Sequence, residues 1–225
     1  MLAVVLALAV ALFSVQDDWS EIPHGDPQTG VVALTFDAGG GASSASTSVL
    51  DTLRERGLHV TFFLSGHWVE EHPDLASQIA TDGHELANHS YSHPDLVRLS
   101  DDQIAWELDY TDQLIFDAAG VPSRPFFRAP FGSRNQRVLD VAAASGFRSV
   151  YWSLDSGDWR ARATAAQVMD RVLRFAQLGD IVVEHIDSQA SAEALPAILD
   201  VFDERGWHVG TVSQVLGLAP ASAAW

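Results

Sequence analysis

Short apolar runs and helix-like segments alternate about seven times along this chain, and no other feature constrains its fold as strongly. The strands that this pattern predicts cover residues 31–36, 59–64, 84–88, 126–127, 147–152, 180–183 and 206–209. The predicted helices cover residues 43–56, 70–81, 100–120, 138–145, 164–177 and 192–205. Strands joined by helices pair in parallel, because each helix carries the chain back along the sheet. The sequence therefore predicts one α/β domain, built as a barrel or as a doubly wound sheet.

Polar motifs follow most of the predicted strands. They occupy residues 35–39, 88–93, 128–132, 155–159 and 183–185. In a parallel barrel the carboxyl ends of all strands meet at one rim, which is where such folds gather an active site. Because the motifs follow several different strands, they favour a barrel with one crowded end.

The charge and composition exclude several classes of partner. The 225 residues carry a net charge of −17, and all 13 basic residues are Arg. Such a surface repels phosphate groups and anionic lipids, so neither nucleic acid nor a membrane is an expected partner. The absence of Cys excludes disulfides and leaves nitrogen and oxygen ligands for any metal. The length suits one domain with a full core, and the sequence does not fix its oligomeric state.

Residues 1–15 form a separate apolar segment. The run from Leu2 to Phe13 is shorter than the roughly 20 residues that a transmembrane helix needs, and it resembles the apolar region of a secretory signal. No basic residue precedes it, and no clear cleavage site follows. We expect an exported protein, extracellular or associated with the envelope of a bacterial or archaeal cell; a buried N-terminal helix is the alternative. The folded domain is predicted to cover residues 28–218.

Asp37 and Arg128 are the first candidate catalytic residues. Asp37 follows a buried strand and precedes a Gly-rich turn, where a carboxylate can act on a reacting water and glycines allow close approach of substrate. Arg128 can pair bidentately with Asp37 and hold it ionised, and the backbone N–H of Phe131 can face a developing oxyanion. The alternatives are an Asp that caps the turn and an Arg in a surface ion pair.

His89 and His93 are the candidate metal ligands. Side chains four residues apart share one face of a helical turn, so both imidazoles can reach one ion. Pro94 prevents the segment from continuing as a long helix. The alternative is two surface histidines in a loop. Tyr91, between the two histidines, is a candidate substrate-binding residue.

The last two motifs supply carboxylates, an aromatic side chain and a further histidine. His185 ends a strand, where a general acid can sit, and Asp155 or Asp158 can orient it and set its protonation. Trp159 can form an apolar wall against a sugar ring. Glu184 should point to the opposite face of the strand and is interpreted as structural. The alternative for this segment is a helix-capping Asp beside a core Trp.

Taken together, the motifs resemble those of the polysaccharide deacetylases, the NodB-like carbohydrate esterases. The similarity extends from about Val31 to Val212 and includes the connecting segments 60–64, 83–89 and 152–155. It implies a distorted (β/α) barrel of about seven parallel strands in a single domain. It also implies removal of N-acetyl or O-acetyl groups from a polysaccharide such as chitin oligomers or peptidoglycan.

The resemblance implies a role for each candidate residue. Asp37 matches the general base, and Arg128 matches the residue that holds this base. His185 matches the general acid, and Asp158 matches its carboxylate partner. The expected substrate-binding residues are Phe131, Trp159, Asp155 and Tyr91. The expected partner is an N-acetylated glycan.

One position departs from the family pattern. The second Asp of the first motif, a metal ligand in the family, is replaced here by Ala38, whose methyl group cannot coordinate. Three outcomes are open: water fills the position, Asp37 becomes a ligand, or the site works without metal, as in relatives that open cyclic amides. We expect a weakened site for a divalent metal, zinc, held by His89, His93 and Asp37. Metal-bound water would attack the acetamide carbonyl.

Metal-assisted hydrolysis of an acetylated glycan is thus the predicted function. One alternative is a hydrolase of cyclic or other non-sugar amides that uses the same residues. Another is a non-catalytic glycan-binding protein whose site has decayed, with Ala38 as the trace of the lost ligand. The retained Arg128 and His185 argue against decay, because a binding module needs neither.

Overall fold

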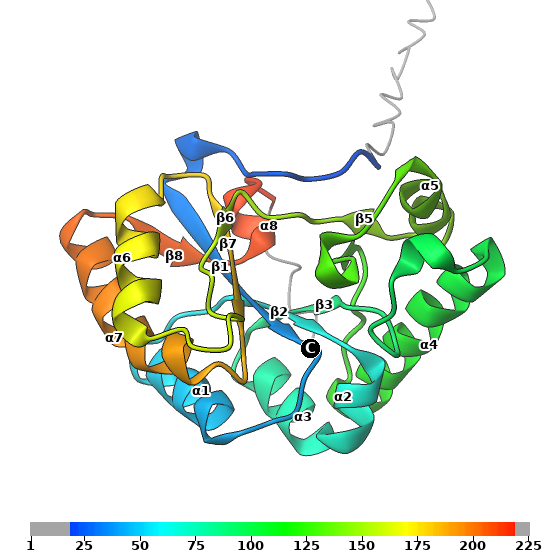
Figure 1. The fold of residues 1–225 in the computed structure, drawn as a ribbon, viewed down its shortest axis with the longest axis horizontal. Coiled ribbons are helices and arrows are strands. Elements are labelled where there is room, and N and C mark those ends of the chain that lie inside the picture. The colour runs from blue at the N-terminus through cyan, green and yellow to red at the C-terminus, as the bar shows by residue number, and fades with distance from the viewer. Residues whose placement is uncertain (1–18, 219–225) are drawn as a thin grey trace, which may run out of the picture.

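The computed structural model describes residues 19–218, so the apolar segment 1–15 lies outside the described part. Within that part, eight strands form one curled sheet in the order β5-β4-β3-β2-β1-β7-β6, with β8 paired to β1. All neighbouring strands pair in parallel. Helices surround the curled sheet (Figure 1). The expected single-domain distorted barrel of about seven parallel strands is confirmed, with seven strands in one path and β8 as an additional partner of β1.

The strands are β1 (Val31–Ala38), β2 (Thr61–Leu64), β3 (Glu85–Asn88), β4 (Phe126–Phe127), β5 (Arg148–Ser149), β6 (Leu154–Asp155), β7 (Ile181–His185) and β8 (His208–Gly210). The helices are α1 (Ser44–Glu55), α2 (Gly66–Glu71), α3 (Pro73–Thr81), α4 (Asp101–Ala119), α5 (Gln136–Ala144), α6 (Ala165–Phe175), α7 (Gln189–Glu204) and α8 (Val212–Val215). Short 3-10 helices occur at Pro27–Thr29, Leu96–Arg98 and Pro130–Gly132. None of these helices is long and apolar enough to cross a bilayer.

Local sequence signals set the helix ends. The Ser100 hydroxyl accepts from the N–H of Gln103, whose side chain accepts from the N–H of Ser100, so the expected capping box begins α4. Gly120 ends α4 in the left-handed conformation. The helix predicted over residues 70–81 is two helices instead, because Pro73 has no N–H and begins a new helix. The sequence pattern did not predict strand β6 or helix α8. They have two and four residues, which are too few to show a hydrophobic period.

The register of β1 builds the rim of the barrel. Its first residues pair with β8 and its last with β2, while β7 pairs along the other side. Asp37 lies directly across from His185 in this register. Because side chains alternate along a strand, Phe36 and Ala38 pack in the core cluster on the opposite face from Asp37. The two candidate catalytic residues therefore lie on adjacent strands at one rim.

Strands β5 and β6 are the two ends of the curled sheet and leave an opening between them. Residues 22–25 cover part of this opening. Ile22 forms a parallel bridge with Val150, just after β5. The N–H of Gly25 donates to the carbonyl of Gly179, just before β7, at 2.8 Å. Residues before position 28 are therefore hydrogen-bonded to the barrel.

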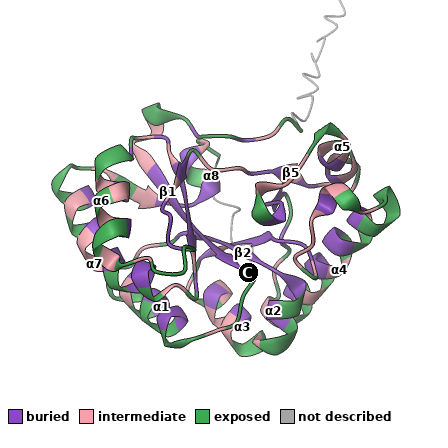
Figure 2. Ribbon diagram, in the orientation of Figure 1, coloured by how far each residue is buried: buried purple, intermediate pink, exposed green. Residues whose placement is uncertain are grey.

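The strands of the sheet consist mostly of buried residues, whereas the outer sides of the helices are exposed (Figure 2). The larger cluster joins the sheet to the surrounding helices and includes Phe36 and Phe202. A smaller cluster includes Ala33 and Ile181, which lie on the same face of the sheet as Asp37. It also includes Ile22, which closes the open edge of the sheet. The barrel interior is therefore apolar below a polar rim.

Truncation of Ile22 should destabilise the fold, because this side chain is 2% exposed and belongs to the smaller cluster. We expect Ile22→Ala to lower the free energy of unfolding by about 2–4 kcal/mol, and Ile22→Val to lower it by only about 1 kcal/mol. Urea denaturation followed by circular dichroism measures both changes. An Ile22→Ala protein as stable as the wild type would show that residues 22–25 do not support the barrel.

Candidate active site

At the carboxyl end of β1, Asp37 forms a buried ion pair with Arg128. Arg128 Nη1 donates to Asp37 Oδ1 at 2.6 Å and to the hydroxyl of Thr35 at 2.9 Å. The remaining guanidinium nitrogens donate to the carbonyls of Val150 and Tyr151, both at 3.3 Å. The structure thus contains the predicted pair, although one nitrogen rather than two contacts the carboxylate.

Asp37 is held as a carboxylate. Burial by itself raises the pKa of Asp37, but the charge of Arg128, with smaller effects of His89 and His185, lowers this pKa below its usual value. Asp37 Oδ2 lies 3.7 Å from Nε2 of His89. One carboxylate oxygen is therefore fixed by Arg128, and the other is directed toward His89. A carboxylate that stays ionised can accept a proton from water at neutral pH.

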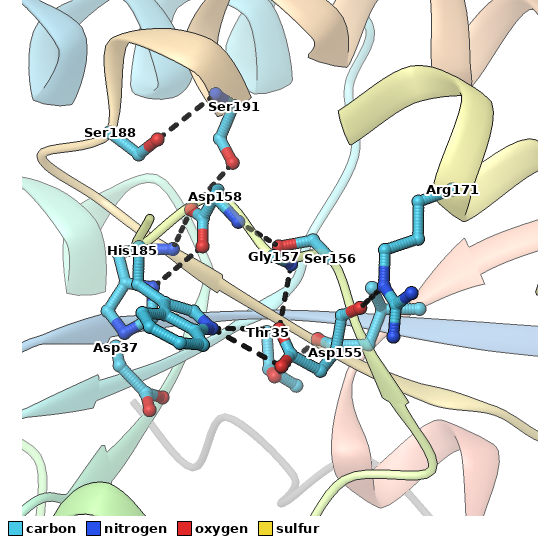
Figure 3. Close-up of polar contacts among 12 residues, drawn as sticks. Thr35, Asp37, Asp155, Ser156, Gly157, Asp158, Arg171, His185, Ser188 and Ser191 are labelled. Carbon is cyan, nitrogen blue, oxygen red and sulfur yellow. Dashed lines mark hydrogen bonds and ion pairs between the residues drawn. The ribbon is translucent and has the colours of Figure 1, made fainter. Parts of the chain in front are cut away.

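His185, at the end of β7, forms a second charged pair with Asp158. Figure 3 shows the Asp158 carboxylate between His185 and Ser191. His185 Nδ1 lies 2.8 Å from Asp158 Oδ1. Asp158 Oδ2 accepts from the backbone N–H of His185 at 2.7 Å and from the Ser191 hydroxyl at 2.8 Å. Three hydrogen bonds therefore fix this carboxylate against the imidazole.

This pairing keeps His185 protonated at neutral pH. Burial lowers the pKa of His185, but the hydrogen bond and charge of Asp158, together with the charges of Asp37 and Asp187, raise it to about 9. Because Nδ1 is bonded to Asp158, Nε2 is the nitrogen left to act in the cavity that His185 lines. An ionised carboxylate and a protonated imidazole thus lie on neighbouring strands of one rim.

The rim residues line a cavity of about 710 Å³. Its walls include the predicted residues Phe131, Trp159 and Asp155, and also Trp152, which no motif placed in the site. Asp155 orients Trp159, because its carboxylate accepts from the indole N–H at 3.2 Å. Phe131 is 72% exposed and Trp159 is 61% exposed, so both rings have surface free to contact a ligand.

The glycines after Asp37 make room for two side chains of the site. A Cβ at Gly39 would lie 2.6 Å from His93 Cδ2, and a Cβ at Gly40 would lie 2.5 Å from Asp187 Oδ2. Both glycines also line the cavity, so the close approach of substrate that the sequence suggested stays a prediction. Asp187 lines the cavity but was not among the predicted site residues. Its position two residues after His185 is the sequence feature that could have predicted it.

His89 and His93 come together in a loop rather than on a helical turn. Ser90 and His93 have φ angles of 62° and 55°, which a right-handed helix excludes. The two imidazoles nevertheless contact edge to face, with ring centroids 4.8 Å apart. Glu107 of α4 holds the loop by accepting from two consecutive backbone N–H groups, the first of them that of Tyr91. The histidines are neighbours as predicted, but the helical geometry was wrong.

The donor set for a metal ion is incomplete. His89 has the arrangement of a ligand, because burial lowers its pKa to about 4 and its Nδ1–H faces the Arg128 carbonyl, which leaves Nε2 with a lone pair. Ala38, at the position of the missing family ligand, has no donor atom and packs in the core. Among residues 19–218, no three His, Asp or Glu side chains are arranged to hold a metal. As the side chains stand, His89, His93 and Asp37 do not fit a three-ligand site.

Glu184 lies beside this site on the opposite face of β7, as predicted. It is fully buried, and neither of its carboxylate oxygens has a hydrogen-bond partner. Burial and the nearby charge of Asp158 raise the pKa of Glu184 to about 8, so the side chain is mostly neutral at pH 7. Its protonation avoids a second buried negative charge beside Asp158.

Tyr91 is not among the residues that line the cavity. Its hydroxyl donates to Glu70 at 2.9 Å, and its ring contacts Trp106 and Tyr110 of α4. The structure therefore brings together the other predicted site residues but directs the Tyr91 side chain elsewhere.

This barrel and its rim match a known class of protein. The sequence profile described as Polysaccharide deacetylase matches residues 24–150. The chain belongs to this family, as its motifs predicted.

Two relatives from Bacillus subtilis illustrate the similarity. The uncharacterized protein YlxY is 33% identical over 195 residues, which cover 87% of this chain and 60% of YlxY. The peptidoglycan-N-acetylmuramic acid deacetylase PdaA is 29% identical over 194 residues, which cover 85% of this chain and 73% of PdaA. The chain therefore spans less than two thirds of the length of YlxY.

Solved structures with the same fold include a protein described as a pseudoenzyme. Wild-type BA3943 of Bacillus anthracis, described as a CE4 family pseudoenzyme, matches with a TM-score of 0.82 and 30% identity over 88% of this chain and 69% of that chain. A BA3943 mutant described as having restored enzymatic activity matches with a TM-score of 0.82 and 31% identity over 88% of this chain and 71% of that chain. The fold of this chain thus occurs in proteins described as active and as inactive.

Restoring the missing carboxylate should strengthen metal binding. We expect Ala38→Asp to raise the affinity for zinc by about 10- to 100-fold, because it adds the anionic oxygen donor that the family pattern predicts at this position. Isothermal titration with zinc measures the affinity, and thermal melting checks that the variant folds. Ala38→Asn is the matched control of similar size without charge. Equal zinc affinities of the wild type and Ala38→Asp would show that position 38 does not govern metal binding.

Proposed function

We propose that this protein is a hydrolase that removes N-acetyl (or O-acetyl) groups from a polysaccharide such as peptidoglycan or chitin oligomers. The observation that carries this proposal is the pair of opposite charges at the rim, the Asp37 carboxylate and the protonated His185. Each has its own buried partner, Arg128 or Asp158. Hydrolysis of an amide needs a base for water and an acid for the departing amine. Membership of the family and the similarity to PdaA support the same reaction.

In the proposed reaction, Asp37 takes a proton from a water molecule as the water oxygen attacks the acetyl carbonyl carbon. His185 donates its Nε2 proton to the nitrogen of the departing amine, the C–N bond breaks, and acetate is released. Arg128 keeps Asp37 ionised before the reaction begins. Asp158 holds the His185 ring and stabilises its charged form.

The exposed rings of the cavity are proposed to position the sugar. Trp159 offers an apolar face beside His185, and the backbone N–H of Phe131 is the proposed donor to the developing oxyanion. Phe131 has a φ of 59°, an uncommon conformation for a non-glycine residue that is often retained at functional sites. We propose that the protein acts at the cell envelope or outside the cell, where such polysaccharides lie.

Replacement of the base should abolish the activity. We expect Asp37→Asn to lower the rate of acetate release from N-acetylglucosamine oligomers or peptidoglycan by at least about 100-fold, the usual contribution of a general base. Release is measured with metal-stripped protein, with and without added zinc or cobalt. The control is Asp51→Asn, because the Asp51 side chain is 51% exposed in α1.

Two outcomes would contradict the proposed hydrolase: full activity of the Asp37→Asn protein, or no acetate release by the wild type under any of these conditions. The second outcome would favour a non-catalytic glycan-binding protein. Ala38 and the similarity to a pseudoenzyme make that the second candidate.

The alkaline limb of the pH profile should report on His185. Activity should fall as the pH rises through about 9, because the imidazole loses the proton that it donates. Asp158→Asn removes the charge that raises the pKa of His185, so we expect this limb to move to lower pH by at least about one unit. Ser191→Ala removes one hydrogen bond to Asp158 but keeps the charge, and it should move the limb less. An unmoved limb in Asp158→Asn would show that another group controls it.

A further inference from the structure

Outside the cavity, three aromatic rings form a cluster that the proposed reaction does not use. We call Tyr91, Trp106 and Tyr110 the aromatic cluster. Trp106 and Tyr110 stack with centroids 5.1 Å apart and planes inclined by 20°. The Tyr91 ring lies 5.3 Å from Trp106 and 5.1 Å from Tyr110. Trp106 is nevertheless 52% exposed, so much of the indole surface is open to a ligand.

Neighbouring groups fix the rings in place. The hydroxyls of Tyr91 and Tyr110 donate to the two carboxylate oxygens of Glu70, at 2.9 and 3.3 Å. Gly66 makes room for one ring, because a Cβ there would lie 2.6 Å from Tyr91 Cδ2. A preorganised surface loses little conformational freedom when it binds a ligand. The aromatic cluster therefore has the rigidity of a binding surface.

The aromatic cluster lies at the same rim as the cavity. Tyr91 precedes His93 by two residues, so at most about 7 Å of chain separates it from a residue that lines the cavity. Trp106 lies in the first half of α4, the helix that follows β3, and Tyr110 lies at the middle of this helix. A helix that connects parallel strands begins at the rim where the preceding strand ends. A polymer bound in the cavity can therefore continue onto this surface.

The chemistry of the aromatic cluster selects an uncharged carbohydrate. The faces of sugar rings carry C–H groups that pack on aromatic rings, and sugar hydroxyls can donate to the Glu70 carboxylate. The net charge of −17 opposes an anionic ligand. Continuity with the cavity then favours the same polymer that supplies the reacting unit.

We propose that the aromatic cluster is a second sugar-binding site, which holds units of the glycan chain beyond the unit in the cavity. This inference rests on the proposed function, because it takes the substrate polymer as the ligand. It assigns Tyr91 to substrate binding at this surface instead of in the cavity.

Binding to insoluble chitin tests the proposal without turnover, because every protein in the assay also carries Asp37→Asn. We expect Trp106→Ala and Tyr110→Ala each to lower the affinity for chitin by at least about fivefold. Phe116→Ala is the matched control, because Phe116 lies on the same helix and is 51% exposed outside the aromatic cluster. It should bind chitin as tightly as its parent. Thermal melting of each variant checks that the fold is intact.

Equal chitin binding by the Trp106→Ala and Phe116→Ala proteins would overturn the proposal, whatever the activity of the wild type. Chitin binding that depends on Trp106, in a protein whose wild type releases no acetate, would support the second site and contradict the hydrolase. Light scattering distinguishes a third case. A dimer that Trp106→Ala converts to a monomer, with chitin binding unchanged, would make the aromatic cluster an interface between copies and overturn the proposal.

Discussion

The buried ion pair of Arg128 and Asp37 is the interaction on which the rest of the site depends. Taking a guanidinium out of water costs several kcal/mol, and the Arg128 side chain is fully buried. The cost is offset by Asp37, by three further oxygen acceptors and by the ring of Phe63, whose centre lies 4.0 Å from the guanidinium carbon. Because the acceptors belong to β1 and to the chain after β5, this one side chain ties distant parts of the barrel together.

Charges of opposite sign alternate across the rim. Arg128 faces Asp37, and Asp158 faces His185, so the two groups proposed to react each have a partner of their own. Without Arg128, a buried Asp37 would favour its neutral form, and without Asp158, a buried His185 would lose its proton. The proposed base and acid can therefore keep opposite charges at the same pH. Ala38 takes part in neither pair, because its methyl group packs in the core.

The barrel and the charged pairs could be predicted because they depend on patterns that are local in the chain. Apolar runs mark the strands, and the polar motifs come directly after them, so shared strand ends imply a shared rim. The loop that carries His93 could not be predicted, because Glu107, on a helix farther along the chain, holds the two residues that lie between its left-handed residues. Trp106 was missed for the same reason, since it meets Tyr91 only when α4 packs against this loop. Unpaired burial of Glu184 is likewise visible only in three dimensions.

The buried Glu184 takes up a proton when this chain folds at neutral pH. Its pKa rises from 4.5 to about 8 on folding, so the folded chain holds at Glu184 a proton that the unfolded chain releases, and the contribution of Glu184 to stability falls as the pH rises from about 4.5 to 8. His185 acts in the same direction, because its raised pKa contributes stability that is complete below 6.5 and is lost as the pH rises through about 9. Both residues lie on β7, one on each face. Alkaline surroundings would thus weaken the strand itself as well as discharge the acid at its end.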